Sequence, residues 1–172
     1  MQLHQSLQIE DINEQIIQME RITKISTNGL TVLKHLEGFR AKPYLDGADV
    51  ATIGYGSTYY SDGKRVHLSD KPISEYEASC LIEDGLVHFE RSVDSYTRDD
   101  INQNEFDALV CFAYNCGTNA LNKSTLLKYI NAYKSDDEIK AQFMRWTKIN
   151  GVVSVGLRNR RIAEIKLYFD GK

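Results

Sequence analysis

The spacing of apolar residues changes along the chain, and each change predicts a boundary between structural elements. In residues 1–24 the apolar side chains recur near one face of a helix, among Gln and Glu; they are Leu3, Leu7, Ile12, Ile16, Met19 and Ile22. We therefore expect an amphipathic leader helix, with residues 1–26 lying outside the domain that follows.

A second helix is predicted after the cluster from Ser26 to Gly29, because these residue types favour helix N-termini. It carries three leucines at helical spacing and ends at Gly38, a residue type that commonly follows the last turn of a helix. Between residues 44 and 67 the helical spacing gives way to aromatic and β-branched residues. Two turn signals lie among them, Asp46-Gly47 and Asp62-Gly63. The sequence therefore predicts a small antiparallel sheet in this segment.

After Pro72 the pattern is helical to the end of the chain. One helix begins at Ser74, which has the spacing of a capping box with Glu77, and it runs to about Asp94. Further helices are predicted at residues 102–115, closed by Gly117, and at 124–132, 136–147 and 156–169. The fold class is therefore α+β: a helix and a small antiparallel sheet form one lobe, and a mainly helical lobe follows. Ligands often bind in clefts between such lobes, so we expect the site there.

Composition narrows the classes of protein to which the chain can belong. Its 172 residues fit one domain, at 27–172, in addition to the leader. Cys80, Cys111 and Cys116 are odd in number, and we interpret all three as buried free thiols. The four histidines form no HExxH pair and the cysteines form no CxxC, so we expect neither a metal nor another cofactor.

The net charge of -3 conceals two segments of opposite sign. Residues 75–107 hold ten acidic and two basic side chains, whereas residues 139–172 hold two acidic and eight basic ones. The basic segment is either a cationic surface that binds anionic cell-envelope polymers or a solvated face that balances the acidic half of the domain. We do not expect nucleic acid as a partner.

No stretch of the sequence predicts a membrane span. The longest apolar run, residues 108–114, has seven residues, far below the roughly 20 needed to cross a bilayer. The first fifteen residues are polar and lack a charged segment followed by an apolar core, so we expect no cleaved secretory signal. The protein is therefore expected to appear first in the cytoplasm.

Candidate chemistry is concentrated between residues 37 and 52. Glu37 ends its helix, where a carboxylate opposes the helix macrodipole. Partial burial there would raise its pKa and let it donate a proton. Each residue also has an ordinary interpretation: Glu37 as a surface residue on a frayed helix end, Asp46 as a turn residue and Thr52 as a strand residue. Eight residues separate Glu37 from Asp46, and five separate Asp46 from Thr52.

This spacing, followed by Gly54-x-Gly56, resembles the pattern of the phage-type lysozymes, or endolysins. Residues 102–117, 123–127, 143–146 and 156–164 also resemble the helical lobe of that family, so the resemblance extends from Gly29 to the end of the chain. One position departs from it, because Ser57 stands where many members carry His. The resemblance implies a lysozyme-like fold with the active site in the cleft between the lobes.

The resemblance also implies a function, namely hydrolysis of the β-1,4 bond between N-acetylmuramic acid and N-acetylglucosamine in peptidoglycan. It makes Glu37 the general acid, with Asp46 and Thr52 holding the attacking water in an inverting arrangement. It implies that an Arg orients Glu37; we choose Arg160, with Arg161 as the rival, and such a partner would lower the pKa that burial raises. The implied substrate-binding residues are Thr58, Tyr114, Asn115, Ser124 and Gln142.

Endolysins of this type act on peptidoglycan in the periplasm after waiting in the host cytoplasm, and by resemblance we expect a membrane-hole-forming partner to release this one. We expect a monomer. Two alternatives stay open at this point: a peptidoglycan-binding module without catalysis, and a membrane-active protein that uses the basic segment. Retention of Glu37, Asp46 and Thr52 together argues against the first alternative.

Overall fold

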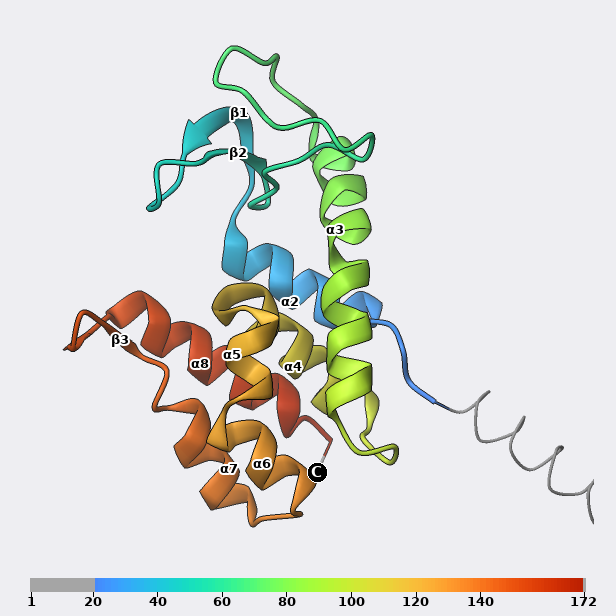
Figure 1. The fold of residues 1–172 in the computed structure, drawn as a ribbon, viewed down its shortest axis with the longest axis vertical. Helices are drawn as coiled ribbons and strands as arrows, with labels where there is room; N and C mark the ends of the chain where they lie inside the picture. Colours follow the sequence, from blue (N-terminus) through green and yellow to red (C-terminus); the bar gives the residue numbers. More distant parts are fainter. Residues whose placement is uncertain (1–20, 172) are drawn as a thin grey trace, which may run out of the picture.

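The structure of the protein is a computed structural model, in which residues 21–171 are placed. The first lobe consists of helix α2 (Thr27–Glu37) and the antiparallel strands β1 (Arg40–Leu45) and β2 (Ala51–Gly54). The long helix α3 (Glu75–Tyr96) connects this lobe to the helical lobe (Figure 1).

The helical lobe is built around α4 (Gln103–Cys116), and every residue of α4 from Glu105 to Ala113 is buried. A helix that is buried on all sides forms the centre of a lobe and does not cover its surface. Around it lie α5 (Thr118–Asn122), α6 (Thr125–Asn131), α7 (Asp136–Phe143) and α8 (Val155–Tyr168). Between α7 and α8, the short strands β3 (Lys148–Ile149) and β4 (Val152–Val153) form a hairpin.

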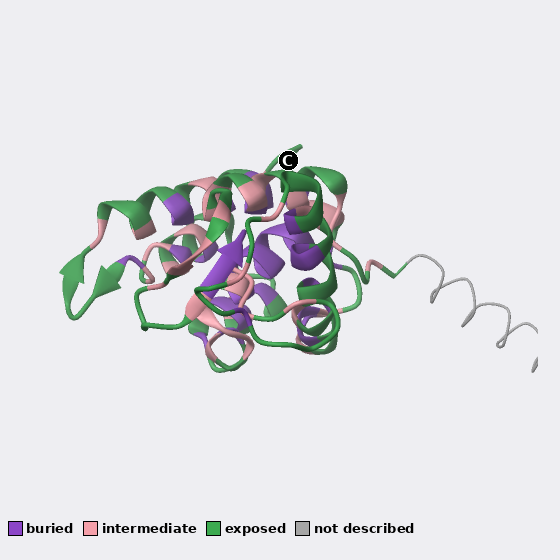
Figure 2. Cartoon of the chain, turned by 90° about the horizontal axis from the view of Figure 1, so that it is seen from above, coloured by how far each residue is buried: buried purple, intermediate pink, exposed green. Residues whose placement is uncertain are grey.

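Aromatic side chains hold the helices of this lobe together. The ring of Phe112 on α4 meets Phe143 and Trp146 edge to face, at centroid distances of 5.8 and 5.3 Å. Such pairs contribute about 0.5–1.5 kcal/mol beyond the burial of their area. Figure 2 shows the buried residues gathered inside the molecule, while the β3–β4 hairpin projects into solvent at the far left. The ring of Phe143 also contacts Tyr168 of α8, so the core fixes both α4 and α8, the helices that carry Tyr114 and Arg160.

Local signals in the sequence predicted most of the helix boundaries. Ser26 caps α2, Gly38 ends it, and the predicted capping box of Ser74 and Glu77 is present. The antiparallel sheet is confirmed but smaller than expected, because residues 55–67 contribute only isolated bridges to it. Of the leader segment, residues 1–20 lie outside the described residues, and residues 21–26 are not helical.

One predicted helix boundary in the helical lobe was wrong, and two elements of this lobe were not predicted. The helix expected at residues 136–147 ends at Phe143, because the chain turns there toward the β3–β4 hairpin, which we did not predict. Asn150 and Gly151 form its turn with φ angles of 50° and 83°. Asn-Gly is the strongest short signal for such a turn, since both positions need a positive φ. The short helix α5 was not predicted either.

The predictions about the cysteine thiols and about the basic segment also need correction. All three cysteines are free, but Cys80 is exposed on α3, and Cys116 is only half-buried. The basic segment is a weaker cationic surface than its composition indicates, because Arg160 and Arg161 are buried. Within the part of the chain that the structure places, no helix is long and apolar enough to cross a membrane.

Candidate active site

Glu37 lies at the junction of the two lobes, where α2 ends. Gly38 follows it with a φ of 72°, and the amide of Gly38 donates to the Lys34 carbonyl at 3.0 Å, which closes the helix. The side chain of Glu37 is 19% exposed. Its Oε1 accepts a hydrogen bond from Arg160 Nη1 at 2.7 Å. A cation from α8 therefore compensates the negative charge of Glu37 at this helix end. The interpretation of Glu37 as a surface residue on a frayed helix end is wrong.

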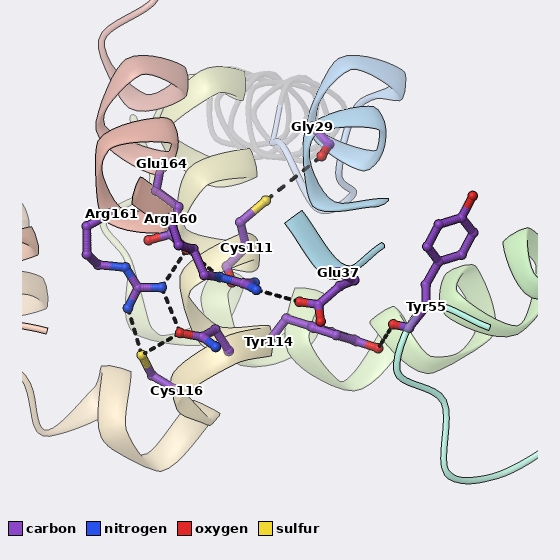
Figure 3. Close-up of polar contacts among 10 residues, drawn as sticks. Gly29, Glu37, Tyr55, Cys111, Tyr114, Cys116, Arg160, Arg161 and Glu164 are labelled. Carbon is purple, nitrogen blue, oxygen red and sulfur yellow. Dashed lines mark hydrogen bonds and ion pairs between the residues drawn. The ribbon is translucent and has the colours of Figure 1, made fainter. Parts of the chain in front are cut away.

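Arg160 is held from three sides, and of the two arginines that the sequence proposed it is the one that contacts Glu37. Besides Glu37, its Nη2 donates to the Cys111 carbonyl at 3.1 Å and its Nε donates to Glu164 at 3.1 Å (Figure 3). A guanidinium with three directed hydrogen bonds has a single orientation. The position of the Glu37 carboxyl group is therefore set by two helices at once.

The second oxygen of Glu37 lies beside Gly56, near the Tyr114 hydroxyl. A Cβ atom added to Gly56 would lie 3.6 Å from Glu37 Oε2 and 3.4 Å from the Tyr114 hydroxyl. Gly56 and Tyr114 line a groove of about 650 Å³, together with Thr58 and residues of α3. Because Gly56 has no side chain, it leaves space beside Glu37 Oε2 at the edge of this groove, although Glu37, Asp46 and Thr52 are not among the residues that line it.

Tyr114 is part of the lining of the groove. Its hydroxyl donates to the Tyr55 carbonyl at 3.1 Å. Burial raises the pKa of Tyr114, and the nearby charge of Glu37 raises it further. The phenol therefore stays neutral across the physiological range and can serve as an apolar platform with a polar tip.

Thr52 lies on β2, and Asp46 lies in the turn directly after β1. Thr52 pairs directly with Tyr44, so these two side chains leave the same face of the hairpin. Burial raises the pKa of Tyr44, Arg40 opposes the rise, and the charges of Glu37 and Asp46 add to it. Both carboxylates therefore lie near the same phenol.

Local hydrogen bonds hold the side chains of Asp46 and Thr52. Asp46 Oδ1 accepts from the amides of Ala48 and Val50, at 2.8 and 2.9 Å. Among the described residues Asp46 Oδ2 has no such partner. Thr52 is 2% exposed, and its hydroxyl donates to the Val50 carbonyl at 2.9 Å. A hydroxyl that donates in this way can still accept a hydrogen bond from a water molecule.

The remaining residues that the sequence proposed do not all gather in the groove. Asn115 lines a second groove with Arg160, and its Oδ1 accepts from Arg161 at 2.8 Å. Ser124 and Gln142 line a separate hollow beside Trp146. The Ser124 hydroxyl caps α6, where it accepts from the Leu127 amide and donates to the Leu121 carbonyl. These bonds already explain why Ser124 is polar.

Sequence reasoning missed Glu164, a carboxylate with no exposed surface that binds both Arg160 and Arg161. Its place one helical turn after two adjacent arginines is the signal that could have identified it. Among residues 21–171 there is no group of three or more His, Cys, Asp or Glu that could hold a metal ion.

Comparison with known proteins identifies the family and supports the fold. A family model described as phage lysozyme matches residues 34–164. The endolysin of Bacillus phage B103 is 41% identical over 150 residues, which cover 86% of this chain and 55% of the relative. The endolysin of Salmonella phage P22 is 36% identical over 138 residues, covering 80% of this chain and 93% of the relative. This chain thus spans about half the length of the Bacillus phage endolysins that it matches.

Among solved structures, an endolysin from the Escherichia coli O157:H7 phage FAHEc1 superposes with a TM-score of 0.79 and 33% identity, covering 87% of this chain and 95% of that one. The two-lobed fold is that of a lysozyme-like protein. The chain belongs to the phage lysozyme family.

Proposed function

We propose that this protein is an endolysin muramidase, which hydrolyses the β-1,4 bond between N-acetylmuramic acid and N-acetylglucosamine in bacterial peptidoglycan. The observation that carries the proposal is the arrangement of Glu37: Arg160 binds Oε1, while Oε2 lies beside Gly56, a residue that lines the neighbouring groove. In the protonated acid, Oε2 donates to the leaving glycosidic oxygen. Arg160 then stabilises the carboxylate that remains.

In this proposal Asp46 and Thr52 hold the attacking water. The water donates one hydrogen bond to Asp46 Oδ2 and one to the Thr52 hydroxyl, and Asp46 accepts the proton as the water attacks. Attack from the face opposite the leaving group inverts the anomeric centre. Thr58 and Tyr114 line the groove and are the substrate-binding residues that its geometry favours.

The products of digestion test this function. We expect purified peptidoglycan to yield fragments that end in reducing N-acetylmuramic acid with their peptide crosslinks intact, as measured by mass spectrometry. NMR of the first product formed should show the α-anomer, because inversion of a β bond gives α. New amino groups from cut peptides beside intact glycans would overturn the muramidase assignment. Binding to peptidoglycan without any cleavage would favour a non-catalytic module.

Thr52 offers a test of how the water is held. Thr52→Ser keeps the hydroxyl and is expected to retain much of the activity, whereas Thr52→Val keeps the shape and is expected to lose more than about tenfold, roughly 1.4 kcal/mol of barrier. Thr31→Val is the matched control, because Thr31 also bonds a backbone carbonyl but lies exposed on α2. Equal turnover by the Thr52→Ser and Thr52→Val enzymes would remove Thr52 from the mechanism.

The names of the relatives also suggest a biological setting. We propose that the protein acts on periplasmic peptidoglycan as a monomer during host lysis, after release from the cytoplasm by a membrane-hole-forming partner. The exposed part of the basic segment, which includes Lys148 and Lys166, would assist by binding anionic envelope polymers. Weaker binding to cell walls at higher ionic strength would support that role.

A further inference from the structure

A chain of alternating charges leads from Glu37 into the interior of the helical lobe. Glu164 lies on α8, one turn after Arg160, and has no exposed surface. Its Oε1 accepts hydrogen bonds from Arg160 Nε at 3.1 Å and from Arg161 Nη2 at 2.7 Å (Figure 3). One carboxylate oxygen thus joins both guanidinium groups, and the first of these binds Glu37.

Arg161 depends on Glu164 for its neutralisation. It is fully buried, and its other hydrogen bonds go to the uncharged Cys116 Sγ at 3.0 Å and to Asn115 Oδ1 at 2.8 Å. Within residues 21–171, Glu164 is the one carboxylate that forms an ion pair with Arg161. Without Glu164, two buried guanidinium charges would act on Glu37, and arginine does not lose its proton in proteins.

The charge of Glu164 affects Glu37, because Glu37 must carry a proton beside Arg160 in order to act as an acid. A nearby positive charge favours the ionised form of a carboxyl group, and the form that donates a proton is the neutral one. Glu164 supplies a negative charge behind Arg160, which offsets the second guanidinium. It also binds Arg160 Nε, on the edge of the guanidinium away from Glu37, and so restricts its rotation.

We propose that Glu164 is a positioning residue for catalysis: it fixes Arg160 against Glu37 and offsets the charge of Arg161, so that Glu37 can hold its proton. This role rests on the function proposed above, in which Glu37 is the general acid. Cleavage of peptidoglycan by the wild-type protein is therefore measured first.

The other titratable and charged groups near this chain of charges stay the same in the variants proposed below. Burial raises the pKa of Glu164, whereas the guanidinium groups of Arg160 and Arg161, both hydrogen-bonded to Glu164, favour its ionised form. Burial also raises the pKa of the neighbouring thiols and phenols, which remain neutral. The groups concerned are Asp107, Cys111, Tyr114 and Cys116 on α4, and Arg40, Tyr44 and Asp46 on or next to β1.

The experiment measures turnover against pH for variants that change one charge at a time. Glu164→Gln removes the offsetting charge, so the basic limb of the profile should move to lower pH by about one unit, the order of magnitude that one uncompensated charge gives in a partly buried site. Arg161→Met removes the second cation, so the limb should move to higher pH. The double variant restores the balance and should return the limb to within about 0.3 unit of wild type.

Glu105→Gln is the matched control. Glu105 is also a buried carboxylate that binds an arginine: Arg98, whose side chain is 17% exposed, places its Nη2 3.1 Å from Glu105 Oε2. It lies nine residues before Tyr114 on α4, roughly 13 Å along the helix axis. We expect this variant to lose stability without any shift of the pH profile. A purely structural role of Glu164 would give the same result for Glu164→Gln.

An NMR titration of the Glu37 side-chain carboxyl carbon supplies a second readout that needs no turnover. Opposite shifts in the two single variants and recovery in the double variant would support the role of Glu164. Superimposable profiles, or shifts of the same sign, would overturn it while leaving the muramidase function intact. If Glu164→Gln does not fold, comparison of Arg161→Met with the double variant decides the question, because only the charge of Glu164 differs between them. The limb should lie at lower pH in the double variant, and equal profiles would overturn the role of Glu164. A wild-type protein that cuts no glycosidic bond would instead overturn the proposed function.

Discussion

Glu37→Gln is expected to lower the turnover of peptidoglycan by roughly 10²- to 10⁴-fold, the range that a general acid commonly contributes. The amide oxygen of Gln can still accept the hydrogen bond that Arg160 Nη1 makes at 2.7 Å, so the group stays in place. What is lost is the ability of Oε2 to release a proton to the leaving oxygen. Because position is kept and the proton is removed, the loss should appear in kcat more than in KM.

The measurement is the rate of reducing-end release from purified peptidoglycan, with circular dichroism to verify the fold. Glu75→Gln is a matched control, because Glu75 Oε1 accepts a hydrogen bond from the Tyr55 hydroxyl at 2.7 Å in the same lobe. Glu75 is exposed and takes no part in the proposed mechanism, so its variant should cleave at close to the wild-type rate. A fully active Glu37→Gln enzyme would remove Glu37 from the role of acid.

The local parts of this site could be predicted from the sequence. Glu37 precedes a helix-ending Gly38, and Asp46 precedes a turn, so the types and spacing of neighbouring residues determine where both lie. A contact between residues far apart in sequence was predicted only once. Arg160 lies 123 residues from Glu37, and it was chosen because the segment around it resembles that of a known family.

The buried network behind Arg160 could not be predicted in the same way. Glu164 and Arg161 look like an ordinary charged pair on a solvated helix, because the sequence does not show which face of α8 packs on α4. Packing of that face turns a surface pair into a buried one, and it removes two cations from the expected basic surface. The β3–β4 hairpin is different, since its Asn-Gly turn was visible in the sequence and was overlooked.

The start of α2, which places Glu37 at its other end, depends on a buried carboxylate from the helical lobe. Asp107 on α4 has no exposed surface, and its Oδ1 accepts from the Ser26 amide at 2.9 Å and from Gln103 Nε2 at 2.8 Å. Its Oδ2 accepts from the Ser26 hydroxyl, which in turn accepts from the Gly29 amide at 3.1 Å. The N-terminus of α2 is therefore tied directly to the core helix.

Gly29→Ala is expected to break this connection and to lower the free energy of unfolding by about 2–4 kcal/mol, combining overpacking with a disturbed buried hydrogen-bond network. A Cβ atom at Gly29 would lie 2.5 Å from Asp107 Cγ, so Asp107 or α2 must move.

Gly85→Ala is the matched control, because Gly85 lies inside α3 with no atom within 4 Å of an added Cβ. There the same substitution should raise stability by about 0.5–1 kcal/mol, since alanine favours the helix and loses less chain entropy on folding. Thermal unfolding of both variants measures the difference, at roughly 2–4 °C for each kcal/mol. Equal melting temperatures for the two variants would show that the contact between Gly29 and Asp107 does not limit where α2 begins.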